Sequence, residues 1–555
     1  MNLSKILAPQ PLPFTYAEWK SKPFAERVRM LCVAWATQGY GAPVSAYVFY
    51  VLKIGFYLAG WLFFCSFSSA LGGVGEIANW WFQPEALEKF VLWSILFEVL
   101  GLGCGSGPLT ARYFPPMGGV LHFARPGTIK LPLFQKLPII GGDKRSVLDV
   151  LLYVALLGSL LRVLLASVAT PELILPVVVL IPILGILDKT IYLAARSEHY
   201  LIALICFLFV GEEIAAAKIV WLAIWWGAAT SKVNRHFPAV VCVMISNHAV
   251  LRFPWLRRKL YKNYPNDLRP SRLAASMAHI GTLTEYGFPL LLIFGGGGPL
   301  TTAGLVIMFG FHLYITSSFP MGVPLEWNVI MVYGAFLLFG HHAEVWMFSL
   351  QAPLLIAILT SSLLLVPILG NLFPKWVSFL LSMRYYAGNW AYSVWLFKGD
   401  CEEKLDEGLM CSSSTVHRQL CRFYDGETAE TLVSKVIAFR SMHLHGRALQ
   451  LLVPEAVDDI ESYTWRDGEL IAGVALGWNF GDGHLHNERL LQAIQKRCDF
   501  APGQLRCIFV ESQPAVNRYM AWRIVDAHDG ELKRGKVSVK ELEALQPFPV
   551  AATQA

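Results

Sequence analysis

The chain has 555 residues, of which 55% are hydrophobic and only 15% are charged, and its net charge is +6. Soluble domains carry about 25% charged residues, so this composition excludes an ordinary soluble protein and predicts one embedded in a membrane. The sequence has no basic stripe interleaved with aromatic residues, the pattern typical of nucleic-acid binding. We therefore expect membrane lipids, and no nucleic acid, as partners.

About ten apolar segments are long enough, or nearly long enough, to span about 30 Å of hydrocarbon. They are Val44–Phe67, Phe90–Cys104, Val147–Val168, Leu173–Leu187, Tyr200–Trp221, Phe237–Leu251, Leu273–Phe294, Leu300–Ser318, Trp327–Phe348 and Pro353–Leu372. The fold class predicted from them is an all-α polytopic membrane helix bundle of about ten transmembrane helices, followed by a small α/β soluble domain.

The loop charges predict the orientation. The N-terminal arm and the loops before the third and seventh segments are basic, which the positive-inside rule requires of cytoplasmic loops. Ten spans then place both termini in the cytoplasm of a multi-pass protein of the bacterial inner (plasma) membrane. Lys232 and Arg235 do not fit, because they fall in a short outer loop. This misfit indicates either a special site or an error in the fifth segment.

The same patterns divide the chain into regions. Residues 1–43 form a cytoplasmic N-terminal arm, and residues 44–372 form the helix bundle, with a re-entrant or interfacial loop at 101–145. Residues 373–398 suit an amphipathic segment at the membrane interface, because Trp and Tyr alternate there with flanking cations. Residues 399–555 have a soluble composition and form the cytoplasmic α/β domain.

Within this last region, periodicity predicts individual elements. Residues 468–478 and 504–512 are expected to form buried strands, and residues 487–497 an amphipathic helix. Residues 520–539 are expected to form two strands joined by a turn that includes Asp529 and Gly530.

Ionisable side chains at membrane depth cost at least about 2.5–3.5 kcal/mol on insertion scales, so each one needs a partner or a function. Four of them, Glu212, Lys218, Glu285 and His312, are candidate catalytic residues, and Lys232, at one end of these segments, is the fifth candidate. We expect them to border one internal pocket, with Lys232 or Lys218 as a base and Glu285 or His312 as its orienting partner. The alternatives are separate structural pairs and, for Lys232, a snorkelling lysine at the outer interface.

No metal centre is expected. Membrane di-iron enzymes need several histidine boxes, whereas this chain has His341-His342 and two His-Leu-His sequences in its soluble region. The ten cysteines include no CxxC pair, so the sequence contains no zinc-ribbon motif either.

The loop after the second segment is rich in Gly and Pro and is also apolar, so we expect it to pack against the bundle rather than extend into solvent. Its cations Arg112, Arg125 and Lys130 are candidates for binding an anionic lipid headgroup. A phosphate-binding GxxxxGK[ST] motif is not found there.

Three long tracts carry a resemblance over nearly the whole chain: GSGPLTARYFPPMGGVLHFARPGTIKLPLF, RYYAGNWAYSVWLFK and GWNFGDGHLHNERLLQ. By these tracts the chain resembles an uncharacterised bacterial family of transmembrane proteins of unknown function. The resemblance implies a membrane protein and brings no activity with it.

A second, partial resemblance covers about 150 residues. The tracts WWGAATSKVNRHF, TEYGFPLLL and FHLYI resemble motifs of the horizontally transferred transmembrane superfamily, which includes vitamin K-dependent gamma-carboxylase. The resemblance places Lys232 at that superfamily's lysine. Ala229 and Val233 depart from its usual glycine and leucine, and the carboxylase's large β-rich domain is missing. A base acting on a membrane quinol or a similar molecule is what this resemblance implies, rather than carboxylation of a protein.

We therefore expect a membrane-embedded enzyme that acts on a lipid or quinone-like substrate. No motif for a soluble cofactor is present, and a membrane quinol is compatible with the sequence. The alternative is a non-catalytic transporter of lipids or small molecules, or a membrane scaffold. A transporter often shows internal repeats, and none is evident here.

Overall fold

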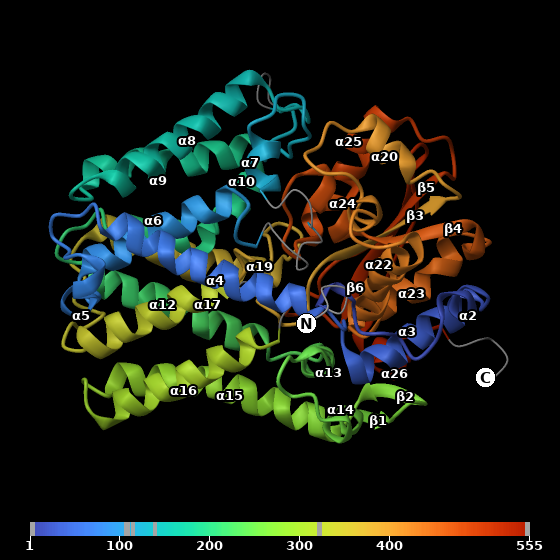
Figure 1. Ribbon diagram of the computed structural model, residues 1–555, viewed down its shortest axis with the longest axis horizontal. Coiled ribbons are helices and arrows are strands. Elements are labelled where there is room, and N and C mark those ends of the chain that lie inside the picture. The colour runs from blue at the N-terminus through green and yellow to red at the C-terminus, as the bar shows by residue number, and fades with distance from the viewer. Residues whose placement is uncertain (1–5, 105–111, 113–116, 137–140, 319–324, 550–555) are drawn as a thin grey trace.

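The computed structural model describes residues 6–104, 112, 117–136, 141–318 and 325–549. A bundle of long helices lies beside an α/β body that contains the larger sheet (Figure 1). The long helices run side by side, with one end toward the α/β body and the other end on the left of the figure.

Six helical segments are long and apolar enough to cross a membrane. They are α4 (Val44–Cys65), α8 (Val147–Leu165), α12 (Glu213–Ser231), α15 (Arg272–Phe294), α16 (Pro299–Thr316) and the run Pro353–Leu372, which joins α18 (Pro353–Thr360), η5 (Ser361–Leu365) and α19 (Val366–Leu372). Residues that favour a helix N-terminus stand at the start of several of these helices. Pro299 and Pro353 occupy the first helical positions of α16 and α18. Ser146 and Asp149 form a capping box at the start of α8. A polytopic helical membrane protein is thus supported, whereas ten spans are not confirmed.

Shorter apolar helices complete the bundle. They are α9 (Pro171–Leu187), η3 (Ser197–Leu201) with α11 (Ile202–Cys206), α13 (Phe237–Asn247), and α17 (Leu325–Ala335) with η4 (Phe336–His341). The second expected span corresponds to α6 (Pro84–Val99), and every residue from Ala86 to Val99 in it is buried. This helix therefore lies inside the bundle and is covered by protein rather than by lipid.

The fifth expected span is wrong in its placement. A turn at 207–212 divides the apolar run, so that α11 ends at Cys206 and α12 begins at Glu213. Hydropathy alone does not detect this break, because the residues on both sides of the turn are apolar. The long helix therefore ends at Ser231, ten residues beyond the expected boundary at Trp221.

The sixth expected span, α13, has 11 residues and a length of about 16 Å, too short for about 30 Å of hydrocarbon. Its ends contact the α/β body and the N-terminal arm: His236 bonds to Gln513 at 2.9 Å, and Asn247 accepts from the backbone of Tyr40 at 3.0 Å. Both ends therefore lie on the side of the bundle that faces the α/β body. Arg235 lies on that side too, paired with Glu543 at 2.7 Å.

The α/β body is built on an antiparallel sheet of five strands in the order β4-β3-β5-β6-β7. The strands are β3 (Tyr392–Lys398), β4 (Tyr463–Asp467), β5 (Leu505–Val510), β6 (Tyr519–Asp526) and β7 (Gly530–Ser538). Its helices are α20 (Glu403–Gly408), α21 (Val416–Leu420), α22 (Gly426–Ser441), α23 (Leu444–Ala456), α24 (Gly468–Ala475), α25 (Glu488–Cys498) and α26 (Val539–Ala544). The helix α25, the strand β5 and the hairpin of β6 and β7 confirm the corresponding predictions from periodicity.

Two predictions near this sheet are wrong. Residues 373–391 form turns rather than an interfacial helix, and residues 392–398 form β3, which is buried from Tyr392 to Phe397 because it is a central strand. Residues 468–475 form the helix α24, whose first turn is capped by the Asp467 side chain. A short apolar run fits a buried helix as well as a buried strand, and here the cap determines the outcome.

The N-terminal arm belongs to the same body. Its helices α2 (Tyr16–Lys20) and α3 (Phe24–Gln38) lie against α22 (Figure 1). The Glu461 carboxylate accepts from the Phe24 N–H at 2.5 Å and from Arg27 at 2.8 Å.

The remaining short elements of the described chain lie between the longer helices and strands. They are η1 (Val74–Glu76), α5 (Ile77–Trp80), α7 (Gly118–Phe123), α10 (Lys189–Ala194), α14 (Pro254–Lys259), β1 (Tyr261–Asn263), β2 (Asp267–Pro270), η6 (Ile460–Ser462) and η7 (Gly483–Leu485).

Candidate functional site

Lys232 and Glu285 form an ion pair between two helices of the bundle. Lys232 is the C-cap residue of α12, and its backbone N–H bonds to the carbonyls of Ala228 and Ala229. Glu285 lies in the middle of α15, and its Oε2 accepts from Lys232 Nζ at 2.5 Å. The two residues are only 9% and 4% exposed. A lone charge at such burial is unfavourable, so each side chain stabilises the charge of the other.

Aromatic rings enclose the ammonium group. Lys232 Nζ lies 5.8 Å from the ring centroids of both Phe237 and Phe311. At this distance the faces of aromatic rings attract a cation. The lysine is therefore held by one carboxylate and two rings, in surroundings that are otherwise apolar.

His312 is fixed in one neutral tautomer by two neighbours. Trp225 Nε1 lies 3.0 Å from His312 Nε2, and because an indole nitrogen can only donate, Nε2 must carry the lone pair. The proton is then on Nδ1, which donates to Asn328 Oδ1 at 2.8 Å. Both ring nitrogens are thus engaged, so His312 positions Trp225 and Asn328 rather than acting as a free base.

These residues border a cavity of about 430 Å³. Helices α12, α13, α15, α16 and α17 contribute to its wall, which is largely apolar. Trp327, Tyr385 and Tyr386 line the part of the wall nearest the α/β body. An apolar cavity with few convergent polar groups is the usual form of a small-molecule site.

Two residues that line the cavity also lie on the outer surface of the bundle. Ile280 of α15 is 62% exposed and Tyr314 of α16 is 38% exposed. Because both helices are candidate membrane spans, this part of the cavity wall lies where lipid would contact the protein.

The other two candidate catalytic residues lie elsewhere. Lys218 is near the start of α12, about 21 Å along the helix from Lys232, and its Nζ donates to the carbonyls of His342 and Val345 at 2.7 and 2.6 Å. Glu212 accepts from the backbone N–H of Ala352, beside the start of α18. The structure thus brings Lys232, Glu285 and His312 together and leaves Lys218 and Glu212 at the opposite end of the bundle.

The three candidate anion-binding residues all bond to protein groups. Arg112 donates to Ser412 Oγ at 2.9 Å and to the Gly473 carbonyl, and Arg125 donates to the Cys411 carbonyl. Lys130 pairs with Asp149 at 2.8 Å. The described part of the loop therefore packs against the bundle, as expected, and also against the α/β body. Residues 105–111, 113–116 and 137–140 lie outside the described chain.

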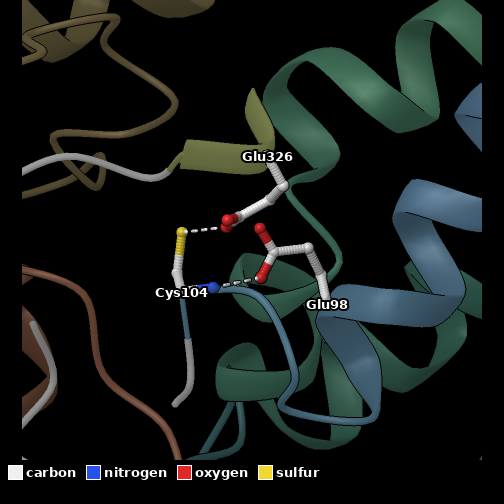
Figure 2. A group of neighbouring side chains, drawn as sticks. All are labelled: Glu98, Cys104 and Glu326. Atoms are coloured by element: carbon white, nitrogen blue, oxygen red, sulfur yellow. Dashed lines mark hydrogen bonds between the residues drawn. The ribbon is translucent and has the colours of Figure 1, made fainter. Parts of the chain in front are cut away.

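Sequence reasoning missed a second polar cluster, in which Glu98, Cys104 and Glu326 face one another (Figure 2). Their ligand atoms all lie within 4.8 Å of one another. Cys104 donates its backbone N–H to Glu98 Oε2 at 2.9 Å, and its Sγ lies 3.4 Å from Glu326 Oε1. The signal was available, because Glu98 is an acidic residue inside the expected span Phe90–Cys104.

A second cavity, of about 850 Å³, lies on the other side of α12. Its wall is formed largely by apolar residues of α12, α15, α18 and α19, and Thr230, Ser231 and Asn371 contribute polar groups at one end. Neither Lys232 nor Glu285 reaches it.

Comparison with known proteins gives one match. A family model described as "Transmembrane protein of unknown function (DUF3556)" covers residues 6–554. No curated protein and no solved structure matches the chain.

Proposed function

Because the chain belongs to the DUF3556 family of transmembrane proteins, we propose that it is an integral membrane enzyme that acts on a lipid or quinone-like molecule in the 430 Å³ cavity. The observation that carries this proposal is the Lys232–Glu285 ion pair on the wall of an apolar cavity that exposed residues of two candidate spans also line. Ionisable groups at membrane depth mark functional sites more often than structural ones.

The pair suits proton transfer. In an ion pair the lysine is an ammonium group and has no lone pair, so Glu285 is the member that accepts a proton from the bound molecule. Lys232 then stabilises the negative charge that remains on that molecule. These roles reverse those expected from the sequence, in which Lys232 was the base. General base catalysis of this kind contributes about 10²–10⁴-fold to a rate.

The remaining wall positions the substrate. Trp225 and Asn328 are held by His312, and the aromatic residues Trp327, Tyr385 and Tyr386 also line the cavity. An aromatic wall suits a planar head group such as that of a quinone, and exposed lining residues on two candidate spans suit its delivery from the bilayer.

The proposed location is the bacterial inner membrane, with both termini in the cytoplasm. Arg235 pairs with Glu543 of the α/β body, and Arg269 of the basic segment 252–272 donates to the Ala544 carbonyl of the same body. Arg235, which contradicted the expected topology, then lies with the other cytoplasmic cations, as the positive-inside rule requires.

The test begins with the bound molecule. We would purify the full chain in native lipid discs and identify co-purified lipids and quinones by mass spectrometry. The wild type and Lys218→Ala, a buried lysine of the same helix outside the cavity, should retain one enriched molecule, whereas Lys232→Ala and Glu285→Gln should lose it.

Turnover is measured next, with the molecule so identified. Glu285→Gln should slow its conversion by at least about 100-fold, because the amide cannot accept the proton. Equal lipid content in the wild type and all three folded variants would contradict the proposal.

The second candidate is a non-catalytic lipid carrier, which the larger apolar cavity of about 850 Å³ favours. In that case the enriched molecule would have long acyl chains, would be retained by Lys232→Ala, and would be recovered unchanged after incubation.

A further inference from the structure

The cluster of Glu98, Cys104 and Glu326 joins parts of the chain that are far apart in sequence. Glu98 is near the end of α6, Cys104 follows in the turn after it, and Glu326 is in the first turn of α17. Their exposed fractions are 0%, 0% and 2%. Figure 2 shows both carboxylates and the thiol directed toward one common point.

Two carboxylate oxygens in this cluster lack a hydrogen-bond partner within the part of the chain that the structure describes. They are Glu98 Oε1 and Glu326 Oε2. Buried carboxylates are almost always paired or coordinated to a metal, because an ionised carboxylate without a partner in low dielectric is strongly unfavourable. Either a further positive group or a proton shared by the two carboxyls must therefore offset this charge.

The neighbouring cations do not supply that positive group. Arg196 is paired with Glu198 at 2.7 Å, and Lys53 Nζ is 3.9 Å from Glu326. Glu98, Glu198 and Glu326 carry three negative charges, and Arg196 and Lys53 carry two positive charges, so the net charge of these groups is −1. Ionisation of the Cys104 thiol would make this net charge −2, which one divalent ion neutralises.

The donor spacing also fits a metal. Zinc binds cysteine sulfur at about 2.3 Å and carboxylate oxygen at about 2.0–2.2 Å, and a tetrahedral angle then separates the two donors by about 3.5 Å. Cys104 Sγ and Glu326 Oε1 are 3.4 Å apart. Arg196 Nη1 lies 3.5 Å from the same sulfur, where a guanidinium stabilises a thiolate.

We propose that Glu98, Cys104 and Glu326 bind one divalent transition-metal ion of the zinc class. One thiolate and two carboxylates leave a fourth position of a tetrahedral ion open, as in catalytic rather than structural zinc sites. The ion would cross-link α6 to the start of α17, next to Trp327 of the cavity wall. This inference does not depend on the proposed function.

The test uses the full chain in detergent. Metal content is measured by elemental analysis after purification, and chelator-treated protein is then titrated with Co²⁺, which gives a thiolate charge-transfer band when cysteine is a ligand. We expect about one ion per chain and a band that saturates at one equivalent. Zn²⁺ should displace Co²⁺ and remove the band.

Variants assign the ligands. Cys104→Ser should abolish the charge-transfer band, and Glu98→Gln and Glu326→Gln should each weaken Co²⁺ binding by at least about tenfold. Matched controls are Glu88→Gln, a buried glutamate of the same helix, and Cys65→Ser, a buried cysteine of α4; both should bind as the wild type does.

Two results would overturn the proposal. One is folded wild-type protein that shows neither bound metal nor a cobalt band, which would indicate that the two carboxyls share a proton instead. The other is a band that persists in Cys104→Ser. Because the first result uses wild-type protein, it holds even where a variant fails to fold.

Discussion

At the scale of single residues, the hydrogen bond between Trp225 and His312 has a measurable role. Among the residues that the structure describes, Trp225 is the donor to His312 Nε2, so Trp225→Phe leaves that nitrogen buried without this partner. We expect a loss of about 1–3 kcal/mol in stability, the usual cost of an unsatisfied buried acceptor. Thermal unfolding of the purified protein measures it.

The control for this change is Trp226→Phe, the next residue in the chain. Its indole donates to the Tyr286 carbonyl over a longer 3.3 Å, so this change removes a weaker bond. Trp226→Phe should therefore lower the unfolding temperature less than Trp225→Phe does. The reverse order would show that the His312 tautomer is not fixed as described.

Histidines of the α/β body predict the response to acid. Burial, together with the charges of Arg440 and Arg447, lowers the pKa of His443 to about 3, although a bond to the Phe439 carbonyl opposes this shift. The unfolded chain, with an ordinary pKa near 6.5, then binds more protons between about pH 3 and 6.5. Stability therefore falls as pH falls through this window.

The expected loss for His443 is about 2 kcal/mol between pH 7.5 and 5. Unfolding temperatures of the full chain at several pH values measure this slope. His443→Gln should reduce the slope, whereas His528→Gln should not reduce it, because the hydrogen bond with Asp529 raises the pKa of this exposed histidine. An unchanged slope in His443→Gln would place the acid sensitivity in other groups.

The candidate site was partly predictable at this scale. Glu285 and His312 each interrupt an apolar run, Lys232 lies in the expected loop after the fifth segment, and a shared cavity is the simplest way to accommodate them. Lys218 was grouped with them because it also interrupts an apolar run, whereas the structure has it near the start of the helix whose other end carries Lys232. Depth along a helix depends on where that helix begins, and the turn at 207–212 carries no strong sequence signal.

At the scale of elements, the backbone after α6 and the first turn of α7 are in direct contact at two glycines, Gly101 and Gly119. Gly101 has a φ of +79°, and a Cβ on Gly119 would lie 2.8 Å from the Gly101 Cα. Gly119→Ala should therefore separate the two elements and destabilise the protein by about 1–3 kcal/mol. Thermal unfolding detects the change.

Gly158→Ala is the matched control. It lies within α8, and a Cβ added there would have no neighbouring atom within 4 Å. The change should therefore leave stability unchanged or raise it by up to about 1 kcal/mol through helix propensity. Similar losses in both variants would mean that the contact of α6 with α7 contributes nothing.

Elements with a single strong period were predictable, and those with an ambiguous pattern were not. The amphipathic helix α25 and the hairpin of β6 and β7 follow directly from their sequence periods. The helices α13 and α24 are short apolar runs that fit several assignments, and only their contacts in the fold decide between them. For α13 the deciding contacts come from the N-terminal arm and from Gln513.

At the scale of the whole molecule, the placement of α12 and α13 makes a topological prediction. Val210 precedes α12 and Val233 follows it, and the two are 80% and 68% exposed. We expect a membrane-impermeant maleimide to label Val210→Cys from outside the cell, and to label Val233→Cys only in inverted vesicles. Both cysteine variants are made in protein that also carries Cys421→Ser, because this change removes the exposed native thiol.

The outcome separates two topologies. If residues 222–236 formed an outer loop, as the apolar runs alone suggest, Val233→Cys would be labelled in intact cells. A cytoplasm-dependent fluorescent reporter fused to the C-terminus should be bright in either case. A dark reporter would overturn the orientation itself.

The packing of the N-terminal arm on the α/β body has a consequence for biosynthesis. Phe24 and Glu461 are bonded across 437 residues of chain, and at about 5–20 residues per second their separate synthesis is about 20–90 s apart. During that interval the surfaces of α2 and α3 that contact α22 in the finished protein, including the Trp35 ring that lies against Phe439, have no partner. The nascent arm must therefore be held by a chaperone or by the membrane surface while the helices are inserted, and a ribosome stalled before residue 461 would leave this apolar face uncovered.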